Sequence, residues 1–301
     1  MPLLNSHQRA ILLMICAATL WSIAGVFTRH LDAARGFEVT FWRSFFSAVF
    51  VAGALLMQQG PGKTFATVRA TGWLGVLSGM MWCVMFVCFM IALTKTSVAN
   101  TLIVMSVAPL LTAFLAWIIL QQKIPQRTWL AIAAALVGII WMFMHGMSKV
   151  GGDHLVGMLI ASAIPIASAV NLIAIKRAGH HVDLIPAILL GSVFSAGLML
   201  PLAWPMQTSL HDIVLLGILG FFQLGLPCML MVRSMQSLSA PEVSLLALLE
   251  VLLGPIWAWL GAGEVPAQET IIGGIVVMAA LVFNELAALR PSLLVNRKLE
   301  N

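Results

Sequence analysis

The sequence predicts an all-α integral membrane protein with ten transmembrane helices. Ten apolar stretches of about 20 residues, the length that crosses a bilayer core, are separated by short polar connections. Only 9% of the residues are charged, and the mean hydropathy is +1.02, whereas a soluble domain carries about 25% charged residues. Because no connection is long enough to hold a separate soluble domain, we expect the function to lie among the helices and the lipid bilayer to be the main partner.

The spans follow one another with little besides turns between them. The first is interpreted as a retained helix and not as a cleaved signal peptide, because nine more apolar stretches follow it and no clear small-residue cleavage site ends it. Prolines inside spans include Pro109 in the fourth, Pro165 in the sixth, Pro227 in the eighth and Pro255 in the ninth. In chain order, the expected spans are residues 10–28, 38–57, 71–93, 98–120, 129–147, 155–175, 184–204, 212–232, 241–261 and 270–289.

The basic residues predict the orientation. Ten spans place both termini on one side, and that side holds 11 of the 16 Lys and Arg residues. Positively charged loops stay in the cytoplasm. We therefore expect a multi-pass plasma-membrane protein, in the inner membrane if the source is bacterial, with cytoplasmic N- and C-termini.

The chain shows signs of an internal repeat. Ala99 and Ala240, at the entries to spans 4 and 9, are 141 residues apart, and so are Pro125 and Pro266, just after those spans. This predicts five-helix repeats at 1–148 and 149–290, followed by a cytoplasmic tail at 291–301. Because five is odd, the second repeat must be inverted in the membrane, an arrangement typical of secondary transporters.

One late segment resembles a known family. Residues 239–266 read SAPEVSLLALLEVLLGPIWAWLGAGEVP, and residues 271–274 and 282–284 continue the pattern. This segment is similar to the late-helix signature of the EamA family, in the drug/metabolite transporter superfamily. The resemblance implies a ten-helix carrier, by default an exporter, and Trp257 within the signature is expected to contact substrate. The Glu264-x-Pro266 ending becomes Lys123-x-Pro125 in the first half, so no symmetric function is assigned to that pair.

Glu250 is the only acidic residue near the middle of a span. It lies about nine residues into span 9, about 14 Å deep at 1.5 Å per residue. A carboxylate there costs about 2.5 kcal/mol or more and usually faces a cavity or a partner. Two interpretations stay open: binding of a proton or a cationic substrate group, and a hydrogen-bonded carboxyl that joins helices. Pro255 is expected to kink the same span, and Pro109 interrupts span 4, its counterpart in the first half.

Two other charged residues near span ends are given structural roles. Arg43 lies about five residues into span 2, from where its long side chain is expected to reach the headgroups, with binding of a substrate carboxylate as the alternative. Ser239-x-x-Glu242 fits a capping box at the start of span 9.

Aromatic and amide side chains supply the remaining candidates for the substrate site. Trp21 lies deep in span 1, and Trp82 with Phe86 one turn later could form an aromatic face in span 3. Asn100, Asn171 and Gln223 could orient a zwitterion, although core packing and interhelical hydrogen bonds explain all of these residues as well.

Other functional classes lack support in the sequence. The basic residues are scattered, which argues against nucleic acid as a partner. The sequence contains no C-x-x-C, H-E-x-x-H, Walker or Rossmann motif, so we expect no enzyme, metal or cofactor.

The sequence is thus interpreted as a secondary transporter that exports amino acids or related small metabolites by alternating access, with proton coupling at Glu250 if transport is coupled. The alternatives are a drug or metallophore exporter of the same fold and a structural or regulatory membrane protein. Oligomeric state is left open.

Overall fold

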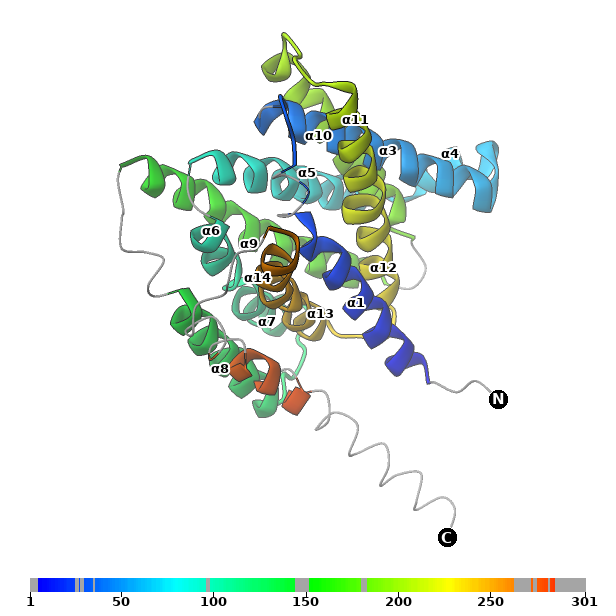
Figure 1. Cartoon of the computed structure of the whole chain (residues 1–301). Coiled ribbons are helices and arrows are strands. Elements are labelled where there is room, and N and C mark those ends of the chain that lie inside the picture. Colours follow the sequence, from blue (N-terminus) through cyan, green and yellow to red (C-terminus); the bar gives the residue numbers. More distant parts are fainter. Residues whose placement is uncertain are drawn as a thin grey trace.

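The computed structural model is built from α-helices, with no strand among the residues it describes (Figure 1). These residues are 5–24, 27, 30–34, 36–95, 98–143, 152–179, 183–262, 272, 275–280 and 282–284. The helices are α1 (Ser6–Ser22), α3 (Gly36–Gln59), α4 (Pro61–Ala70), α5 (Gly72–Lys95), α6 (Val98–Met105), α7 (Ala108–Ile119), α8 (Gln126–Phe143), α9 (Gly152–Ala178), α10 (Ile185–Ala203), α11 (Leu210–Ile218), the π-helix η1 (Leu219–Gly225), α12 (Leu226–Ser234), α13 (Ala240–Ala247) and α14 (Leu249–Ala262).

Five described helical segments are long and apolar enough to cross a membrane. They are α3, most of α5, most of α9, α10 and the continuous run formed by α11, η1 and α12. The other expected spans coincide with shorter or interrupted helices, such as α6 with α7 and α13 with α14. The all-helical membrane architecture is therefore observed, whereas the count of ten spans stays a prediction.

The helix of span 4 is interrupted where the sequence indicated. α6 ends at Met105 and α7 begins at Ala108, with Pro109 in its first turn. Proline has no N–H to donate and disfavours helical geometry in the residue before it. The chain therefore stops one helix and starts another just ahead of Pro109.

The interruption of span 9 lies earlier than Pro255. α13 ends at Ala247, and α14 starts at Leu249 and includes Pro255 within its bounds. At the junction, the Leu248 N–H donates to the Leu245 carbonyl, and the Val251 N–H donates to the Leu248 carbonyl. These tighter i to i−3 hydrogen bonds change the helix direction directly before Glu250.

A third interruption, in span 8, was not specified by the sequence analysis. The π-helix η1 separates α11 from α12, and Pro227 lies in the first turn of α12. A Cβ added at Gly220 in η1 would lie 2.7 Å from the Arg43 carbonyl oxygen of α3. The wider π turn thus carries its glycines against α3, and such turns occur frequently at functional sites.

Small and hydroxylated residues hold the long helices together. α5 packs against α9 and α10, and α10 packs against α3. Between α3 and α10, Ser44 hydrogen-bonds Ser195 at 2.8 Å and Ser47 hydrogen-bonds Ser192 at 3.0 Å. Because lipid gives no hydrophobic drive for helix association, close approach and interhelical hydrogen bonds must supply the attraction.

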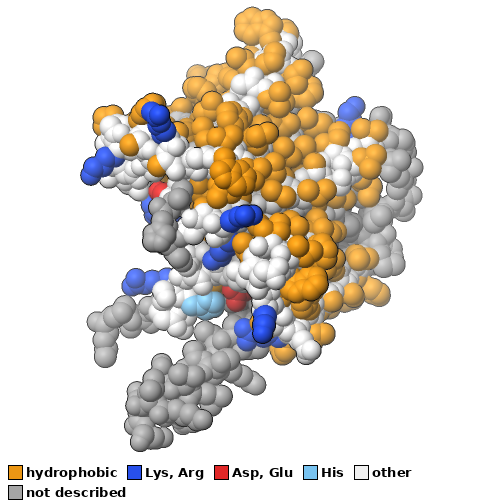
Figure 2. Space-filling model, turned by 180° about the vertical axis from the view of Figure 1, so that it is seen from behind, with side chains coloured by type: hydrophobic (Ala, Val, Ile, Leu, Met, Phe, Trp, Pro, Cys, Tyr) orange, Lys and Arg blue, Asp and Glu red, His pale blue; other side chains and the backbone are white. Residues whose placement is uncertain are grey.

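The outer surface is apolar. Figure 2 shows hydrophobic side chains over the upper and right-hand parts of one face, with Lys and Arg side chains at its left edge, near its middle and toward its lower end. Trp73, at the start of α5, and Trp204, just after α10, are 67% and 75% exposed. Exposed indoles at helix ends are the pattern expected at membrane interfaces.

Replacing Gly191 by Ala is expected to destabilise the α5–α10 contact. The new Cβ would lie 2.4 Å from the Trp82 Cβ and 2.9 Å from the Gly79 carbonyl oxygen. Overpacking of this kind costs about 1–3 kcal/mol. Thermal unfolding in detergent, followed by size-exclusion chromatography, measures the effect. Gly197→Ala on the same helix is the control, since nothing lies within 4 Å of its Cβ; equal melting temperatures for both variants would contradict this account of the contact.

Candidate functional site

A central cavity of about 150 Å³ lies where the interrupted helices meet. Its walls come from α1, α3, α5, α6, α7, α9, η1, α12, α13 and α14, and the junction residue Leu248 lines it as well. Segments from both ends of the sequence therefore form one site. Thioether, aromatic and a few polar side chains make up its lining.

Six of the eight residues proposed from the sequence as substrate contacts line this cavity: Trp21, Trp82, Phe86, Asn171, Gln223 and Glu250. Asn100 belongs to the first turn of α6, but its side chain lies outside the described part of the structure. Trp257 does not line the cavity. A role for any of them in transport stays a prediction.

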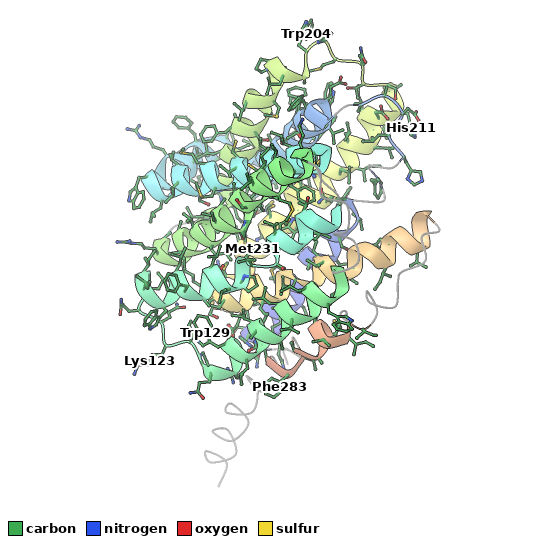
Figure 3. The ribbon with its side chains drawn as sticks, turned by 90° about the vertical axis from the view of Figure 1, so that its left-hand side faces the viewer. Lys123, Trp129, Trp204, His211, Met231 and Phe283 are labelled. Carbon is green, nitrogen blue, oxygen red and sulfur yellow. The ribbon has the colours of Figure 1, made fainter. Side chains whose placement is uncertain are left out.

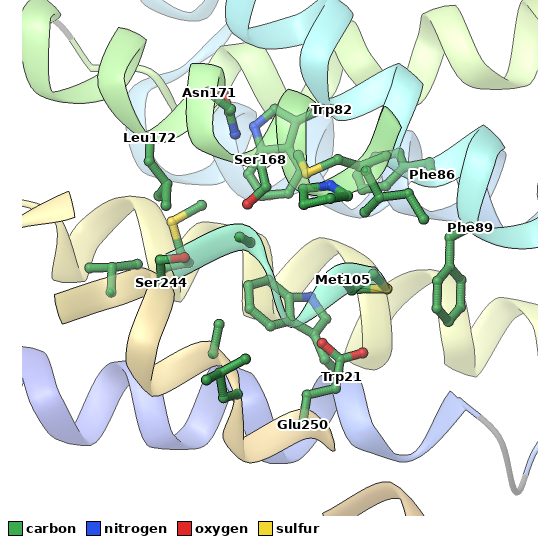
Figure 4. Close-up of a pocket in the computed structure, with 18 of the residues that line it drawn as sticks. Trp21, Trp82, Phe86, Phe89, Met105, Ser168, Asn171, Leu172, Ser244 and Glu250 are labelled. Atoms are coloured by element: carbon green, nitrogen blue, oxygen red, sulfur yellow. The ribbon is translucent and has the colours of Figure 1, made fainter. Parts of the chain in front are cut away.

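Glu250 lies in the first turn of α14, immediately after the junction at Leu248. Figure 4 shows its carboxylate beside the indole of Trp21, across the cavity from Trp82 and Phe86. Among the described residues, no hydrogen bond or direct ion pair involves this carboxylate. The carboxylate that follows the helix junction can therefore bind a proton or a ligand.

Arg43 requires a correction to the sequence analysis. Its side chain is 2% exposed and lines the cavity, so the interpretation that it reaches the headgroups was wrong. Position along a span gives depth, but rotation of the helix decides which way a side chain points. Arg43 belongs to a buried face of α3 that also carries Thr40, Ser44 and Ser47. This polar stripe at helical spacing was the missed signal, because polar side chains in membrane helices face the protein interior.

Gln223 connects the π-helix to two other helices at the cavity wall. Its Nε2 donates to the Trp21 carbonyl of α1 at 3.2 Å, and its Oε1 accepts from Arg43 Nη1 at 3.5 Å. The second distance is long for a hydrogen bond. Gln223 therefore holds α1 and η1 together but satisfies Arg43 only weakly.

The opposite wall combines an aromatic pair with hydrogen-bond donors. The rings of Trp82 and Phe86 have centroids 5.5 Å apart. Trp82 is 4% exposed, and its Nε1 has no hydrogen-bond partner within the described part of the chain. Asn171 Oδ1 accepts from Ser78 Oγ at 2.6 Å, and Figure 4 shows the Asn171 nitrogen directed toward the Trp82 nitrogen. Both N–H groups thus remain available beside the aromatic surface.

Glu242 has the structural role that its spacing predicted. The Ser239 N–H donates to Glu242 Oε2 at 2.8 Å, and the Glu242 N–H donates to Ser239 Oγ at 3.4 Å. This reciprocal pair is the predicted capping box at the start of α13. The prediction is confirmed.

Two further carboxylates connect distant segments away from the cavity. Asp212 accepts hydrogen bonds from the N–H groups of Asp32, Ala33 and Ala34 at 2.8–3.0 Å. Glu38 accepts from the Gln207 N–H at 3.1 Å. The bonds to Asp212 join the segment before α3 to the first turn of α11, and the bond to Glu38 joins the start of α3 to the connection between α10 and α11.

The EamA-like transporter family matches this chain twice, over residues 8–144 and 155–285. The chain belongs to this family. It is a multi-pass membrane protein and a transporter of small metabolites, and the resemblance inferred from residues 239–266 is confirmed.

Named relatives are distant but match over nearly the whole chain. The pseudopaline exporter of Pseudomonas aeruginosa is 24% identical over 290 residues, which cover 93% of this chain and 96% of the relative. The S-adenosylmethionine uptake transporter of Rickettsia prowazekii is 22% identical over 286 residues, 93% of each chain. One solved crystal structure has a TM-score of 0.78 at 16% identity and covers 93% of this chain and 98% of that one, which shows the same fold.

Trp257→Phe is expected to lower stability without changing substrate preference. Trp257 Nε1 donates to Ser22 Oγ at 2.8 Å and so ties α14 to α1 beside the cavity. Loss of one such bond costs about 0.5–1.5 kcal/mol. Thermal unfolding and a transport assay on the same preparation separate the two effects. Trp117→Phe, on the exposed face of α7, is the matched control; a changed substrate preference in Trp257→Phe alone would instead assign Trp257 to the site.

Proposed function

We propose that this family member is a secondary transporter that exports amino acids or related small metabolites by alternating access. The observation that carries the proposal is the cavity itself, which lies at the helix interruptions and takes its walls from both parts of the chain. Interrupted helices around a shared site are typical of carriers that rock two halves against each other.

The proposed architecture has ten spans in two inverted five-helix repeats, residues 1–148 and 149–290, with a tail at 291–301. Two separate family matches support the division into repeats. The interruption between α6 and α7 and the one between α13 and α14 fall in the spans that the repeat pairs with each other. An odd number of helices per repeat then requires the second to be inverted.

Both termini are proposed to lie in the cytoplasm. In Figure 3, Lys123 lies at one end of the molecule, and Trp204 and His211 lie at the opposite end. Lys123 belongs to the Lys- and Arg-rich set of connections, which remain cytoplasmic by the positive-inside rule. This arrangement agrees with the orientation that the charge bias predicts.

Proton coupling is assigned to Glu250. Its carboxylate has no hydrogen-bond partner among the described residues, while Arg43 lines the same cavity and is the basic group that faces it. A proton and a substrate cation would compete for the carboxylate, so each would leave when the other arrives. Exchange of this kind moves substrate against its gradient without ATP hydrolysis. This agrees with the sequence, which contains no Walker motif for binding ATP.

The substrate class is inferred from the lining. An acidic group, a basic group and an aromatic wall fit a zwitterion with an apolar side chain better than a polyanion or a sugar. The named relatives carry different substrates and include both an exporter and an uptake transporter. A drug or metallophore exporter therefore remains the alternative, favoured by the exporter among the relatives.

The test is uptake of a labelled amino-acid panel into proteoliposomes, with and without an imposed pH gradient. Saturable uptake of one compound class would support the proposal. No uptake of any amino acid by folded protein would overturn the substrate assignment, and failure of drugs and metal chelators as well would contradict a transport role.

Glu250→Gln is expected to preserve folding and to abolish the stimulation of uptake by a pH gradient, because the amide keeps the shape of the side chain but does not titrate. Initial rates at several pH values measure this. Glu242→Gln is the matched control on the same span, since Gln can also complete a capping box. An unchanged pH profile in Glu250→Gln would remove the coupling role.

A further inference from the structure

A buried cation without a full set of partners lies at the cavity wall. Arg43 is 2% exposed, yet among the residues that the structure describes its Nε has no hydrogen-bond partner, and its one hydrogen bond there is the 3.5 Å contact with Gln223. A guanidinium carries five N–H donors and stays charged in proteins. Such a group is costly to bury unless a negative partner completes its hydrogen bonds.

The obvious internal partner does not fill this role. Glu250 and Arg43 have opposite charges and line the same cavity, but in the described part of the structure the two side chains form no direct ion pair. Because both line the same space, a ligand can lie between them. The separation leaves one positive and one negative group available to a molecule that carries both charges.

The neighbouring polar groups also favour an acceptor-rich ligand. Trp82 Nε1 is buried and has no hydrogen-bond partner among the residues whose positions are described. Asn171 uses its oxygen to accept from Ser78, which leaves its amide N–H groups to face the cavity (Figure 4). Among the described residues that line the cavity, Arg43, Trp82 and Asn171 supply N–H donors, whereas Glu250 supplies the only carboxylate. A carboxylate ligand supplies about four lone-pair sites and can bind a guanidinium through two parallel hydrogen bonds.

The structure assigns Arg43 as the anchor of the substrate carboxylate, in a site that selects zwitterionic amino acids with one apolar or aromatic side chain. This assignment rests on the proposed export function and specifies its substrate. The ammonium group faces Glu250, and the side chain lies on the Trp82–Phe86 wall. An apolar cavity of about 150 Å³ in another protein holds benzene, so the volume suits one such side chain.

The first experiment uses the wild-type protein and three probes that differ by one charged group. L-phenylalanine carries both charges, 2-phenylethylamine lacks the carboxylate, and 3-phenylpropionate lacks the ammonium group. Binding to the purified protein is measured as a ligand-dependent rise in melting temperature. L-phenylalanine is expected to bind most tightly, and 2-phenylethylamine is expected to lose most of the affinity. Equal affinity for the amine and the amino acid would overturn the assignment.

The second experiment changes the anchor. Arg43→Gln is expected to weaken L-phenylalanine and 3-phenylpropionate by about 30-fold or more, while leaving 2-phenylethylamine unchanged or improved, because only the carboxylate has lost its partner. Arg43→Lys keeps the positive charge but cannot form two parallel hydrogen bonds to a carboxylate. Its affinity for L-phenylalanine is expected to lie between those of wild type and Arg43→Gln. Arg233→Gln is the matched control, since Arg233 is exposed and bonds Gln58 outside the cavity; it should match wild type.

The outcomes separate this inference from the proposed function. If amino acids are transported but Arg43→Gln and Arg43→Lys discriminate between the amino acid and the amine as the wild type does, the anchor is wrong and the transport function stands. If Arg43→Gln does not fold, Arg43→Lys and the wild-type probe series decide. If the wild type neither binds nor transports any amino acid, the proposed substrate class fails and the anchor fails with it.

Discussion

The structure depends on one constraint: within a bilayer, every backbone N–H and C=O must find a partner inside the protein. Continuous helices satisfy this locally, whereas an interrupted helix leaves groups that only a protein interior or a water-filled cavity can satisfy. Three interruptions occur here, between α6 and α7, at η1, and between α13 and α14. All three border the central cavity. The interrupted helices and the cavity therefore occupy the same part of the protein.

The same reasoning explains how charge is distributed across the molecule. Carboxylates that only build structure are fully bonded: Asp212 accepts three backbone N–H groups, and Glu242 completes a helix cap. Glu250 and Arg43, in contrast, face the cavity with free bonding capacity. A membrane protein keeps such groups only where a ligand, a proton or water completes them. The contrast between bonded and unbonded charges separates structural from functional residues more clearly than depth in the membrane does.

Helices on one side of the molecule pack closely against one another, whereas the helix that forms another wall of the cavity is interrupted. α3, α5 and α10 approach closely through Gly79, Gly191 and the Ser44–Ser195 and Ser47–Ser192 pairs. The wall formed by α13 and α14 instead turns at Leu248, directly before Glu250. A carrier needs a fixed part against which a second part can move. The closely packed helices suit the fixed part, and the interrupted wall suits the part that moves.

The sequence by itself determined the class, the family and six of the residues that line the cavity. Apolar length and scarcity of charge dictate membrane helices, since lipid accepts nothing else, and isolated polar residues such as Glu250, Gln223 and Asn171 are costly enough in lipid to mark the protein interior. Only the tertiary structure decided which way each helix faces. Rotation turned Arg43 into the cavity and Trp257 toward Ser22. The structure also places a break in span 9 at Leu248, ahead of Pro255. The physical reason is that sequence spacing fixes the relative positions of side chains on one helix, whereas the contacts between helices fix the direction of the whole helix.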